Sequence, residues 1–388
     1  MRVLRRLTLG AAAVALAFAI GSAGGSVRAA PQSTVVGHVY VNENTAGTNQ
    51  IAGFDRHADG SLTPISGSPF AAGGAGTGST TPSQGALQMS GDGRYLLAVD
   101  AGSNEISVLR IKPDGALTPV EDSPVSSGGK TPVSIAVHGN LVYVANTGAS
   151  GSNYTGFTLN AGGHLRPITG STYPLPDNAL PGDVVFNSTG TLLAGTRVGP
   201  AAGPSFIDSF TVSNDGHLHA AAGSPFPAQG IGPFGSEFRP TNASQLFVSN
   251  AHNGPGAGTV SAFSVASDGA LNSIGTSPFP DLQTAPCWVE ISHDGQVLFT
   301  VNTAVPSMSS YSIAANGALT LVGAPTAFKS PSGLRPFDAR LDPTGGFLYV
   351  VGASKVSAFA VNGSNLTELP GSPFSLPVGA SAFGIVAN

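Results

Sequence analysis

Charged side chains are scarce in this sequence: Asp, Glu, Lys and Arg together make up 10% of its 388 residues. The 16 basic residues form no run that could neutralise a series of phosphates, so nucleic acid is not an expected partner. Hydrophobic residues nevertheless reach 41%, which is enough apolar material for a core. The chain is therefore expected to fold rather than to remain disordered.

Cysteine is almost absent as well. The single cysteine, Cys287, excludes any internal disulfide, so stability must come from packing and topology. It lies between Pro286 and Trp288 at the start of an apolar segment, where a buried and unreactive side chain is the usual outcome. Beyond residue 30 no hydrophobic run is long enough to cross a bilayer, and no membrane span is expected in the mature chain.

The first thirty residues have the pattern of a secretory signal peptide. Three arginines precede an apolar stretch, Leu7–Ile20, and small residues for cleavage follow at Val27–Ala30. Two of the arginines are adjacent, which leaves the twin-arginine route open beside the general one. We expect residues 1–30 to be removed on export and residues 31–388 to form one secreted domain.

Glycine and proline are abundant, with 53 and 30 residues, and this argues against a helical bundle. A short turn followed by leucine recurs at a mean spacing of about 51 residues, a period typical of propeller blades. A Tyr-Val-x-Asn type of strand precedes the turn, and a Gly-Ser-Pro-Phe segment often follows it. The seven turns are Asp59-Gly60, Asp114-Gly115, Gly162-Gly163, Asp215-Gly216, Asp268-Gly269, Asn316-Gly317 and Asn362-Gly363.

One unit, taken in full, predicts a four-stranded antiparallel meander. The unit has four segments of strand composition, and an Asp-Gly or Asn-Gly turn forms two of the connections between them. The segments are Cys287–Ser292, Val297–Asn302, Ser309–Ala314 and Leu319–Gly323. A single such sheet cannot bury both of its apolar faces, whereas seven sheets packed around an axis can do so. The sequence therefore predicts an all-β, seven-bladed propeller.

The predicted ring closes through its C-terminus. Inner strands open six of the units, and the N-terminal segment Val35–Asn42 corresponds directly to a second strand. The missing inner strand is expected at Ser381–Val386, which resembles the other six. We therefore expect the last residues to pair into the first blade, and deletion of Ser381–Asn388 to be far more damaging than a loop deletion of equal length.

The turn Asp114–Pro119, the Gly67–Phe70 segment and the Tyr-Val-x-Asn strands resemble the lactonase family of seven-bladed β-propellers over about residues 35–388. That family is similar to bacterial 6-phosphogluconolactonases and fungal carboxymuconate cyclases, and its repeats relate it to YVTN-repeat propellers. The resemblance implies lactone chemistry at one mouth of the ring, with Arg, His and Glu contributed by several blades. It specifies architecture better than chemistry.

Most of the polar residues that the family would use are replaced here. The family's Gly-Pro-Arg-His reads Gly232–Gly235 in this chain, its Val-Asn-Glu reads Ser249–Ala251, and its Ser-Asn-Arg reads Val301–Thr303. Glu43 and Arg197 occupy family-like slots, but Glu43 does so in a different blade. Both are candidates for ligand binding, and ordinary loop polarity is the alternative explanation.

Alignment of the inner strands on their leading proline identifies a second set of candidates. Glu237, Glu290 and Arg340 fall at one height on three successive blades. Three further side chains, Asp183, Asp338 and Trp288, lie one step nearer the mouth. Charges in this position form either a structural ion pair between blades or a ligand site. In a ligand site, a glutamate would serve as base toward water and Arg340 would stabilise an oxyanion.

Two functions follow from these observations. One is a lactonase-like hydrolase of a small polar ligand, with Glu237, Glu290 and Arg340 as catalytic residues and the other candidates binding the ligand. The other is a non-catalytic YVTN-type propeller that binds a protein, glycan or small ligand through loops such as Ala71–Ser83 and Arg197–Phe206. A polar pocket that gathers the charges would favour the enzyme, whereas charges paired and shut away would favour the binding module.

No cofactor is expected for either function, and the protein is expected to be a monomer. A metal site is also not expected, because His217 and His219 share a strand face without a third ligand near in sequence.

Overall fold

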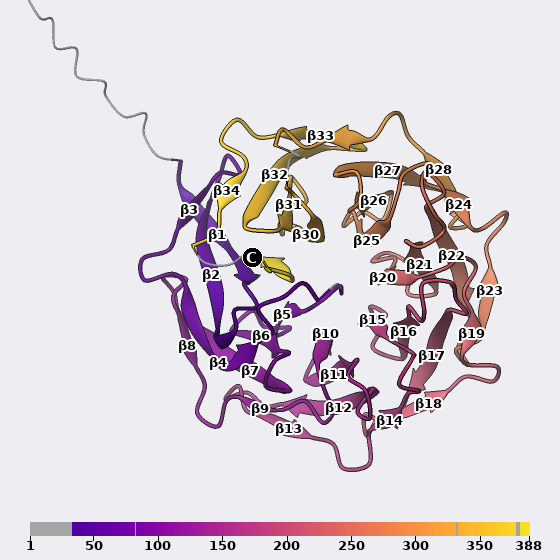
Figure 1. The fold of residues 1–388 in the computed structure, drawn as a ribbon, viewed down its shortest axis with the longest axis horizontal. Coiled ribbons are helices and arrows are strands. Elements are labelled where there is room, and N and C mark those ends of the chain that lie inside the picture. The colour runs from indigo at the N-terminus through magenta and orange to yellow at the C-terminus, as the bar shows by residue number, and fades with distance from the viewer. Residues whose placement is uncertain (1–32, 82, 331–332, 378–380) are drawn as a thin grey trace, which may run out of the picture. The chain divides into compact units, whose positions relative to one another are not determined.

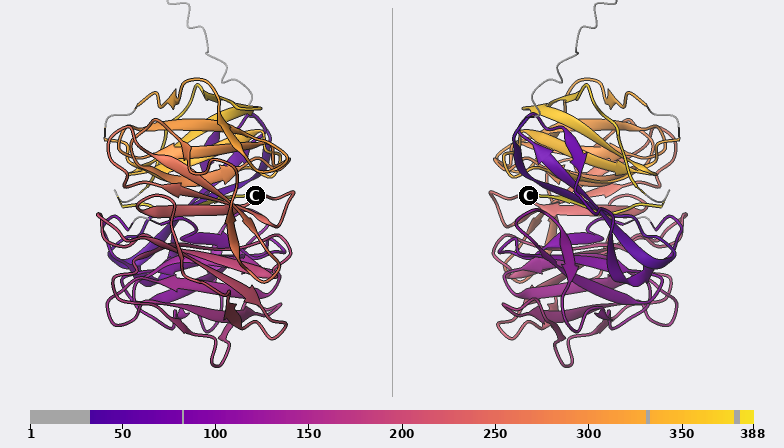
Figure 2. Two further views of the ribbon diagram at one scale, coloured as in Figure 1. Left: turned by 90° about the vertical axis from the view of Figure 1, so that its right-hand side faces the viewer. Right: turned by 90° about the vertical axis from the view of Figure 1, so that its left-hand side faces the viewer.

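The computed structural model describes residues 33–81, 83–330, 333–377 and 381–388. The predicted signal peptide, residues 1–30, lies outside them. The strands of the described residues form seven antiparallel sheets that follow one another around a ring (Figure 1). Side views show the sheets stacked around this ring, with their connecting loops on its two faces (Figure 2). Among the described residues no helix has the length and apolarity to cross a membrane.

Each sheet, or blade, contains a meander of four strands, as predicted, and blades 1 to 7 are numbered in chain order. The inner strands, nearest the axis, are β35 (Ile385–Ala387), β5 (Leu87–Met89), β10 (Pro132–His138), β15 (Pro181–Phe186), β20 (Pro233–Phe238), β25 (Pro286–Ile291) and β30 (Pro336–Leu341). The second strands are β1 (Val35–Asn42), β6 (Tyr95–Asp100), β11 (Leu141–Asn146), β16 (Leu192–Arg197), β21 (Gln245–Asn250), β26 (Val297–Asn302) and β31 (Phe347–Gly352).

The outer half of each blade is built in the same order. The third strands are β2 (Gly47–His57), β7 (Glu105–Ile111), β12 (Asn153–Leu159), β17 (Phe206–Val212), β22 (Thr259–Val265), β27 (Ser307–Ile313) and β32 (Lys355–Asn362). The outer strands are β3 (Leu62–Pro64), β8 (Leu117–Pro119), β13 (Leu165–Pro167), β18 (Leu218–Ala220), β23 (Leu271–Ser273), β28 (Leu319–Leu321) and β33 (Asn365–Glu368).

A fifth strand that the sequence did not predict also pairs with the third strand of each blade. These strands begin in or near the Gly-Ser-Pro-Phe segments, and they are β4 (Phe70–Gly76), β9 (Val125–Ser126), β14 (Tyr173–Pro174), β19 (Phe226–Pro227), β24 (Phe279–Pro280), β29 (Thr326–Ala327) and β34 (Phe374–Ser375). Their positions give the Gly-Ser-Pro-Phe repeat a structural reason. In blade 1, the Ser68 hydroxyl accepts a hydrogen bond of 2.9 Å from the Gly53 backbone N–H of β2.

The tyrosine of the Tyr-Val-x-Asn strand connects its blade to the turn of the next blade. The Tyr40 hydroxyl in blade 1 donates a hydrogen bond of 2.8 Å to the carbonyl oxygen of Gly115 in blade 2. The same contact is made by two further pairs, Tyr143 with Gly216 and Tyr349 with Gly60. The three glycines have φ between 77° and 84°, a conformation that favours glycine. The two repeated motifs are therefore partners across blade boundaries.

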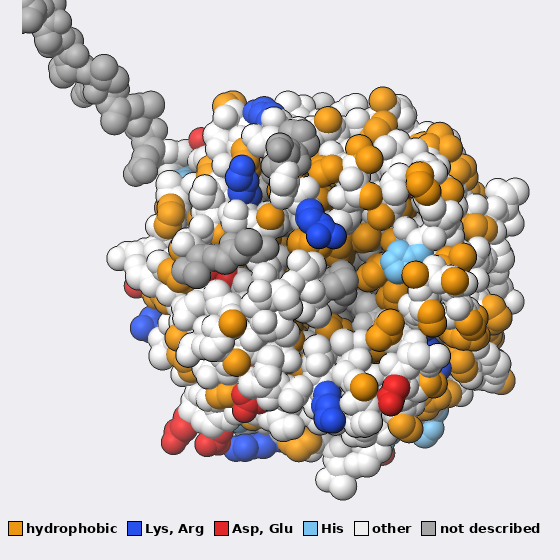
Figure 3. Space-filling view, in the orientation of Figure 1, with side chains coloured by type: hydrophobic (Ala, Val, Ile, Leu, Met, Phe, Trp, Pro, Cys, Tyr) orange, Lys and Arg blue, Asp and Glu red, His pale blue; other side chains and the backbone are white. Residues whose placement is uncertain are grey.

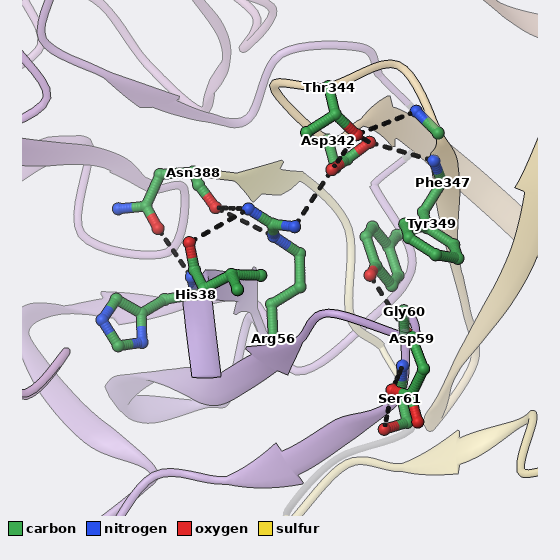
Figure 4. A network of polar contacts seen from close by, with 12 residues as sticks. His38, Arg56, Asp59, Gly60, Ser61, Asp342, Thr344, Phe347, Tyr349 and Asn388 are labelled. Atoms are coloured by element: carbon green, nitrogen blue, oxygen red, sulfur yellow. Dashed lines mark hydrogen bonds and ion pairs between the residues drawn. The ribbon is translucent and has the colours of Figure 1, made fainter. Parts of the chain in front are cut away.

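The ring closes as predicted, because β35 pairs antiparallel with β1 and serves as the inner strand of blade 1. Figure 4 shows the contacts that hold this end in place. The Asn388 backbone N–H donates to the His38 carbonyl at 2.9 Å, and Arg56 Nε and Nη2 donate to the Asn388 carbonyl oxygen at 2.9 and 2.7 Å. Arg56 also pairs with Asp342 of blade 7 at 3.0 Å. Arg56 thus joins the last blade, the first blade and the C-terminal strand.

We predict that Arg56→Met lowers the free energy of unfolding by about 3–5 kcal/mol, because it leaves the Asp342 carboxylate buried without its cation. The side chains of Arg56 and Asp342 are 4% and 0% exposed. Urea unfolding of purified protein measures the change. The control is Arg166→Met, which removes an arginine from an exposed ion pair with Asp122 and should leave the unfolding midpoint almost unchanged. Equal effects of the two changes would contradict this account of ring closure.

Candidate functional site

A cavity of about 230 Å³ lies along the axis of the ring between the inner strands. We call it the axial cavity. Its polar lining residues are Gln84, Gln88, Asp183, Ser188, Ser236, Glu237 and Arg340. Gln84 is buried, whereas Ser188 is exposed on the hairpin turn after β15, and the cavity therefore opens toward that face of the ring.

Glu237, Glu290 and Arg340 are brought together at the axis, as the strand alignment predicts. Glu237 Oε2 accepts a hydrogen bond of 2.7 Å from the Ile291 backbone N–H, and Glu290 Oε1 accepts one of 2.7 Å from Leu341. Each glutamate thus holds the inner strand of the following blade. Arg340 Nη1 lies 3.5 Å from Glu290 Oε2, so the predicted structural ion pair is present. Glu290, however, is not among the residues that line the cavity.

Any reaction in the axial cavity would therefore depend on Glu237 and Arg340. Within the described part of the chain, Arg340 has the Glu290 ion pair but makes no hydrogen bond, and its Nε is buried without a partner. Its side chain is 26% exposed, although the inner strands enclose it, because part of its surface lines the cavity. Burial raises the pKa of Glu237 well above its usual value, repulsion by Glu290 adds to this shift, and Arg340 opposes it.

Asp183 and Asp338 also link inner strands. Asp183 Oδ2 accepts hydrogen bonds from the Ser236 backbone N–H at 2.9 Å and from its hydroxyl at 2.7 Å, while Ser134 donates to Oδ1 at 3.0 Å. Asp338 Oδ1 accepts from the Ala339 N–H of its own strand at 2.9 Å, and its Oδ2 accepts from the Ile385 N–H of β35 at 3.4 Å. Burial raises the pKa of each aspartate to about 7, and hydrogen bonds to Asp183 only partly offset its shift.

The loop between β4 and β5 reaches the centre of the ring and closes the axial cavity on the other face (Figure 1). Gln84 contacts two blades on the far side: its Nε2 donates to the Ser236 carbonyl at 3.2 Å, and its Oε1 accepts from the Val289 N–H at 3.1 Å. The Trp288 indole donates to the Ser83 carbonyl at 2.7 Å. A side chain at position 235 would overlap Gln84 Oε1, which explains the glycine there.

Three predicted ligand-binding residues have other surroundings. Arg197 forms a two-point ion pair with Asp208, with contacts of 2.6 and 2.5 Å, and its side chain is 10% exposed. Trp288 and Glu43 are almost wholly buried, at 1% and 0% exposure. None of the three is among the lining residues of the axial cavity. Sequence alignment could not show this for Arg197, because Asp208 lies on the next strand and its buried charge requires a cation.

A second hollow, which we call the mouth cleft, lies on the face closed by the β4–β5 loop. It consists of two cavities of about 610 and 440 Å³ that share Phe234 and His252. The larger cavity is also lined by Cys287, Leu334, Arg335 and Phe337, and the smaller one by Val133, Leu180, Pro181, Val198 and Pro200. In Figure 3, hydrophobic side chains are frequent over the right half of this face. Burial lowers the pKa of His252, which is therefore largely uncharged at neutral pH.

Comparison with known families now decides the relationship. The family described as "Lactonase, 7-bladed beta-propeller" matches residues 37–173 and 238–380. The chain belongs to this lactonase family. A search of curated proteins found no match.

Solved structures similar to this lactonase-family propeller include two bacterial proteins. A Bacteroides uniformis protein, provisionally assigned as a 6-phosphogluconolactonase, is 21% identical over 91% of this chain and 100% of its own, with a TM-score of 0.71. The periplasmic gluconolactonase PpgL of Pseudomonas aeruginosa is 19% identical over 90% of this chain and 98% of its own, with a TM-score of 0.68. At these identities the likeness shows the fold alone.

The lactonase-family positions that are replaced in this chain point to the mouth cleft. By the resemblance described above, Phe234 and Thr303 are expected in the places of two family arginines, and both line the larger cavity. Ala251, expected in the place of a glutamate, precedes the cleft residue His252. His252 and Arg335 were missed from the sequence, as was Gln84 as an axial residue. The first position after each leading proline was the available signal for the cleft, since Phe234, Cys287 and Phe337 share it.

No group of three or more His, Cys, Asp or Glu side chains in the described ranges is arranged to hold a metal ion. Lactone hydrolysis can proceed with a base and an oxyanion donor alone. Among the cavity residues, Glu237 and Arg340 provide such groups.

We predict a pH dependence for Asp183 that its neutral analogue lacks. Its pKa of about 7 lies above the ordinary aspartate value, so between about pH 4 and 7 the folded protein holds a proton that the unfolded chain has released. The parent should therefore lose stability relative to Asp183→Asn as pH rises through this range, with a slope of at most about 1.4 kcal/mol per pH unit. Urea unfolding at a series of pH values measures the difference. Asp268→Asn, at an exposed turn, is the control, and a flat difference for Asp183→Asn would contradict the prediction.

Proposed function

We propose that this lactonase-family protein hydrolyses a small polar lactone in the axial cavity. The observation that carries this proposal is the presence of Glu237 and an incompletely bonded Arg340 in the lining of one cavity. Water would add to the lactone carbonyl carbon while Glu237 accepts its proton, and Arg340 would bind the resulting oxyanion. Collapse would break the ring C–O bond, and the released alkoxide would take the proton back, giving a hydroxy acid.

The polarity of the cavity supports a small polar substrate. Gln84, Gln88 and Ser236 place amide and hydroxyl groups beside the two proposed catalytic residues. The volume of about 230 Å³ lies below the usual 300–1,000 Å³ of sites for drug-sized ligands, and it therefore favours a single-ring substrate. Gln84 closes one end, so substrate would enter and product would leave on the face of Ser188.

A non-catalytic binding propeller is the second candidate, and one observation favours it. The positions where the family pattern places charged residues at the mouth hold Phe234, Ala251 and Thr303, and these cannot supply an acid, a base or an anion clamp. An absence of lactone hydrolysis together with ligand binding at the mouth cleft would support this second function.

We further propose that the protein is exported, because residues 1–30 have the composition and order of a cleavable signal peptide. Expression of the full chain in a bacterial host, followed by N-terminal sequencing of the protein outside the cytoplasm, tests this. Cleavage after Ala29 or Ala30 is the expected result. An intact N-terminus on protein retained in the cytoplasm would contradict export.

We predict that Glu237→Gln lowers kcat/KM for lactone hydrolysis by roughly 10²–10⁴-fold, the range for loss of a general base. The glutamine can still accept the Ile291 N–H bond, so the fold should be retained. Because the pKa of Glu237 is raised above its usual value, parent activity should rise with pH as Glu237 loses its proton, and the variant should lose this rise. A pH-stat assay on a panel of sugar lactones and simple lactones measures both effects.

Two comparisons make this test decisive. Glu121→Gln changes an exposed glutamate and should leave kcat/KM unchanged. Arg340→Lys keeps a positive charge beside Glu290 but removes the planar donor set, and it should lower kcat by about 10²-fold or more. Absence of hydrolysis by the parent across the panel would overturn the proposal, and so would full activity of Glu237→Gln.

A further inference from the structure

The floor of the mouth cleft contains a row of aromatic rings. The His252 ring lies 5.3 Å from the Phe234 ring between centroids, and Phe234 lies 6.4 Å from Trp288. Trp288 in turn lies 5.7 Å from Phe337, edge to face. Arg335 Cζ stands 5.9 Å from the Phe337 ring centroid. Phe234, His252, Phe337 and Arg335 line the cleft, while Trp288 lies buried beneath it.

Backbone geometry accounts for this row. The inner strands of blades 5, 6 and 7 each have a register irregularity directly after the leading proline. Such an irregularity re-aims the residue that it leaves unpaired. Phe234, Cys287 and Phe337 occupy this position, and all three line the larger cavity. The aromatic floor is thus built on the strands of the hub, which makes it a preformed surface for a flat apolar group.

The charge of the cleft has one sign. Arg335 is exposed and has no hydrogen bond or ion pair with any residue in the described part of the chain. No aspartate or glutamate lines either cavity of the cleft. An arginine beside an aromatic floor, without an acid lining the cleft, provides a bidentate donor for a carboxylate. Its positive charge disfavours the binding of a cation. The larger cavity, at about 610 Å³, has the size of a small-molecule site.

We propose that the mouth cleft binds an aromatic carboxylate, with its ring on Phe234 and Phe337 and its carboxylate on Arg335. The site is separate from the axial cavity, because Gln84, Ser83 and Trp288 stand between them through the hydrogen bonds described above. Binding there involves no covalent step and does not depend on the proposed hydrolysis. The ligand class also differs from a polyhydroxylated sugar lactone, which would find few partners on an apolar floor.

Titration with 2-naphthoate tests the proposal, with 2-naphthylmethanol as the uncharged analogue. Trp288 is the only tryptophan of the chain, so its indole N–H gives a single NMR signal that reports directly on the layer beneath the cleft. We expect 2-naphthoate to release or absorb heat in calorimetry, to shift this signal on the same concentration scale, and to bind about tenfold more tightly than 2-naphthylmethanol.

Variants locate the site. Arg335→Gln should weaken 2-naphthoate binding by about tenfold and leave 2-naphthylmethanol binding unchanged, whereas Arg166→Gln, at an exposed arginine of another blade, should change neither. Ala304→Phe places a ring at an exposed position of the cleft lining without adding a second indole signal, and it should abolish the shift of the Trp288 signal. Glu237→Gln should bind 2-naphthoate as the parent does, which separates this test from that of lactone hydrolysis.

Several results would overturn the proposal. These are the absence of 2-naphthoate binding up to millimolar concentration, binding that leaves the Trp288 signal unmoved, and unchanged affinity in Arg335→Gln. Equal affinity for the charged and uncharged probes would also overturn it, because the cleft would then select for apolarity alone.

Discussion

The hub of this propeller depends on one kind of contact, in which a polar group near the axis accepts a hydrogen bond from a backbone N–H of another blade. Glu237 and Glu290 make it to the blade that follows each of them, and Asp183 does the same for Ser236. In a closed ring no blade can move alone, because each is held on both sides. The acids of the hub are therefore structural groups first. Any chemistry at the axis must use the bonding capacity that remains, and Arg340 has the most of it.

The fold was predictable because its repeats record contacts between neighbours. The tyrosine of one blade and the Asp-Gly turn of the next are hydrogen-bond partners, so both recur at the same period. Ring closure was predictable for a similar reason: the second strand of blade 1 lacked an inner partner, and Ser381–Val386 was an unpaired segment of matching composition. The fifth strand was missed because in six of the described blades it pairs over only two residues, which leaves no alternation for a sequence pattern to show.

The site was only partly predictable. Alignment on the leading prolines correctly placed Glu237 and Arg340 together, because residues at the same register position of neighbouring inner strands lie at the same height along the axis. Arg197 did not join them, since the partner that fixes it, Asp208, lies on the adjacent strand β17 and is itself buried. Gln84 was beyond reach for another reason. It takes the place of the leading proline in blade 2 but bonds to residues 152 and 205 positions away, so no local period contains its role.

Gln84 also lies between the axial cavity and the mouth cleft. The carboxamide oxygen of Gln84 accepts a hydrogen bond from the Val289 N–H. A side chain at position 235 would overlap this oxygen, and glycine leaves room for it. Once the β4–β5 loop covers the axis, the residues above it no longer share a polar cavity with the acids below. Phe234, above the loop, packs near the rings of His252 and Trp288 and is not among the residues that line the axial cavity. The polar and the apolar hollow of this propeller are thus separate, divided by the contacts of Gln84, Ser83 and Trp288.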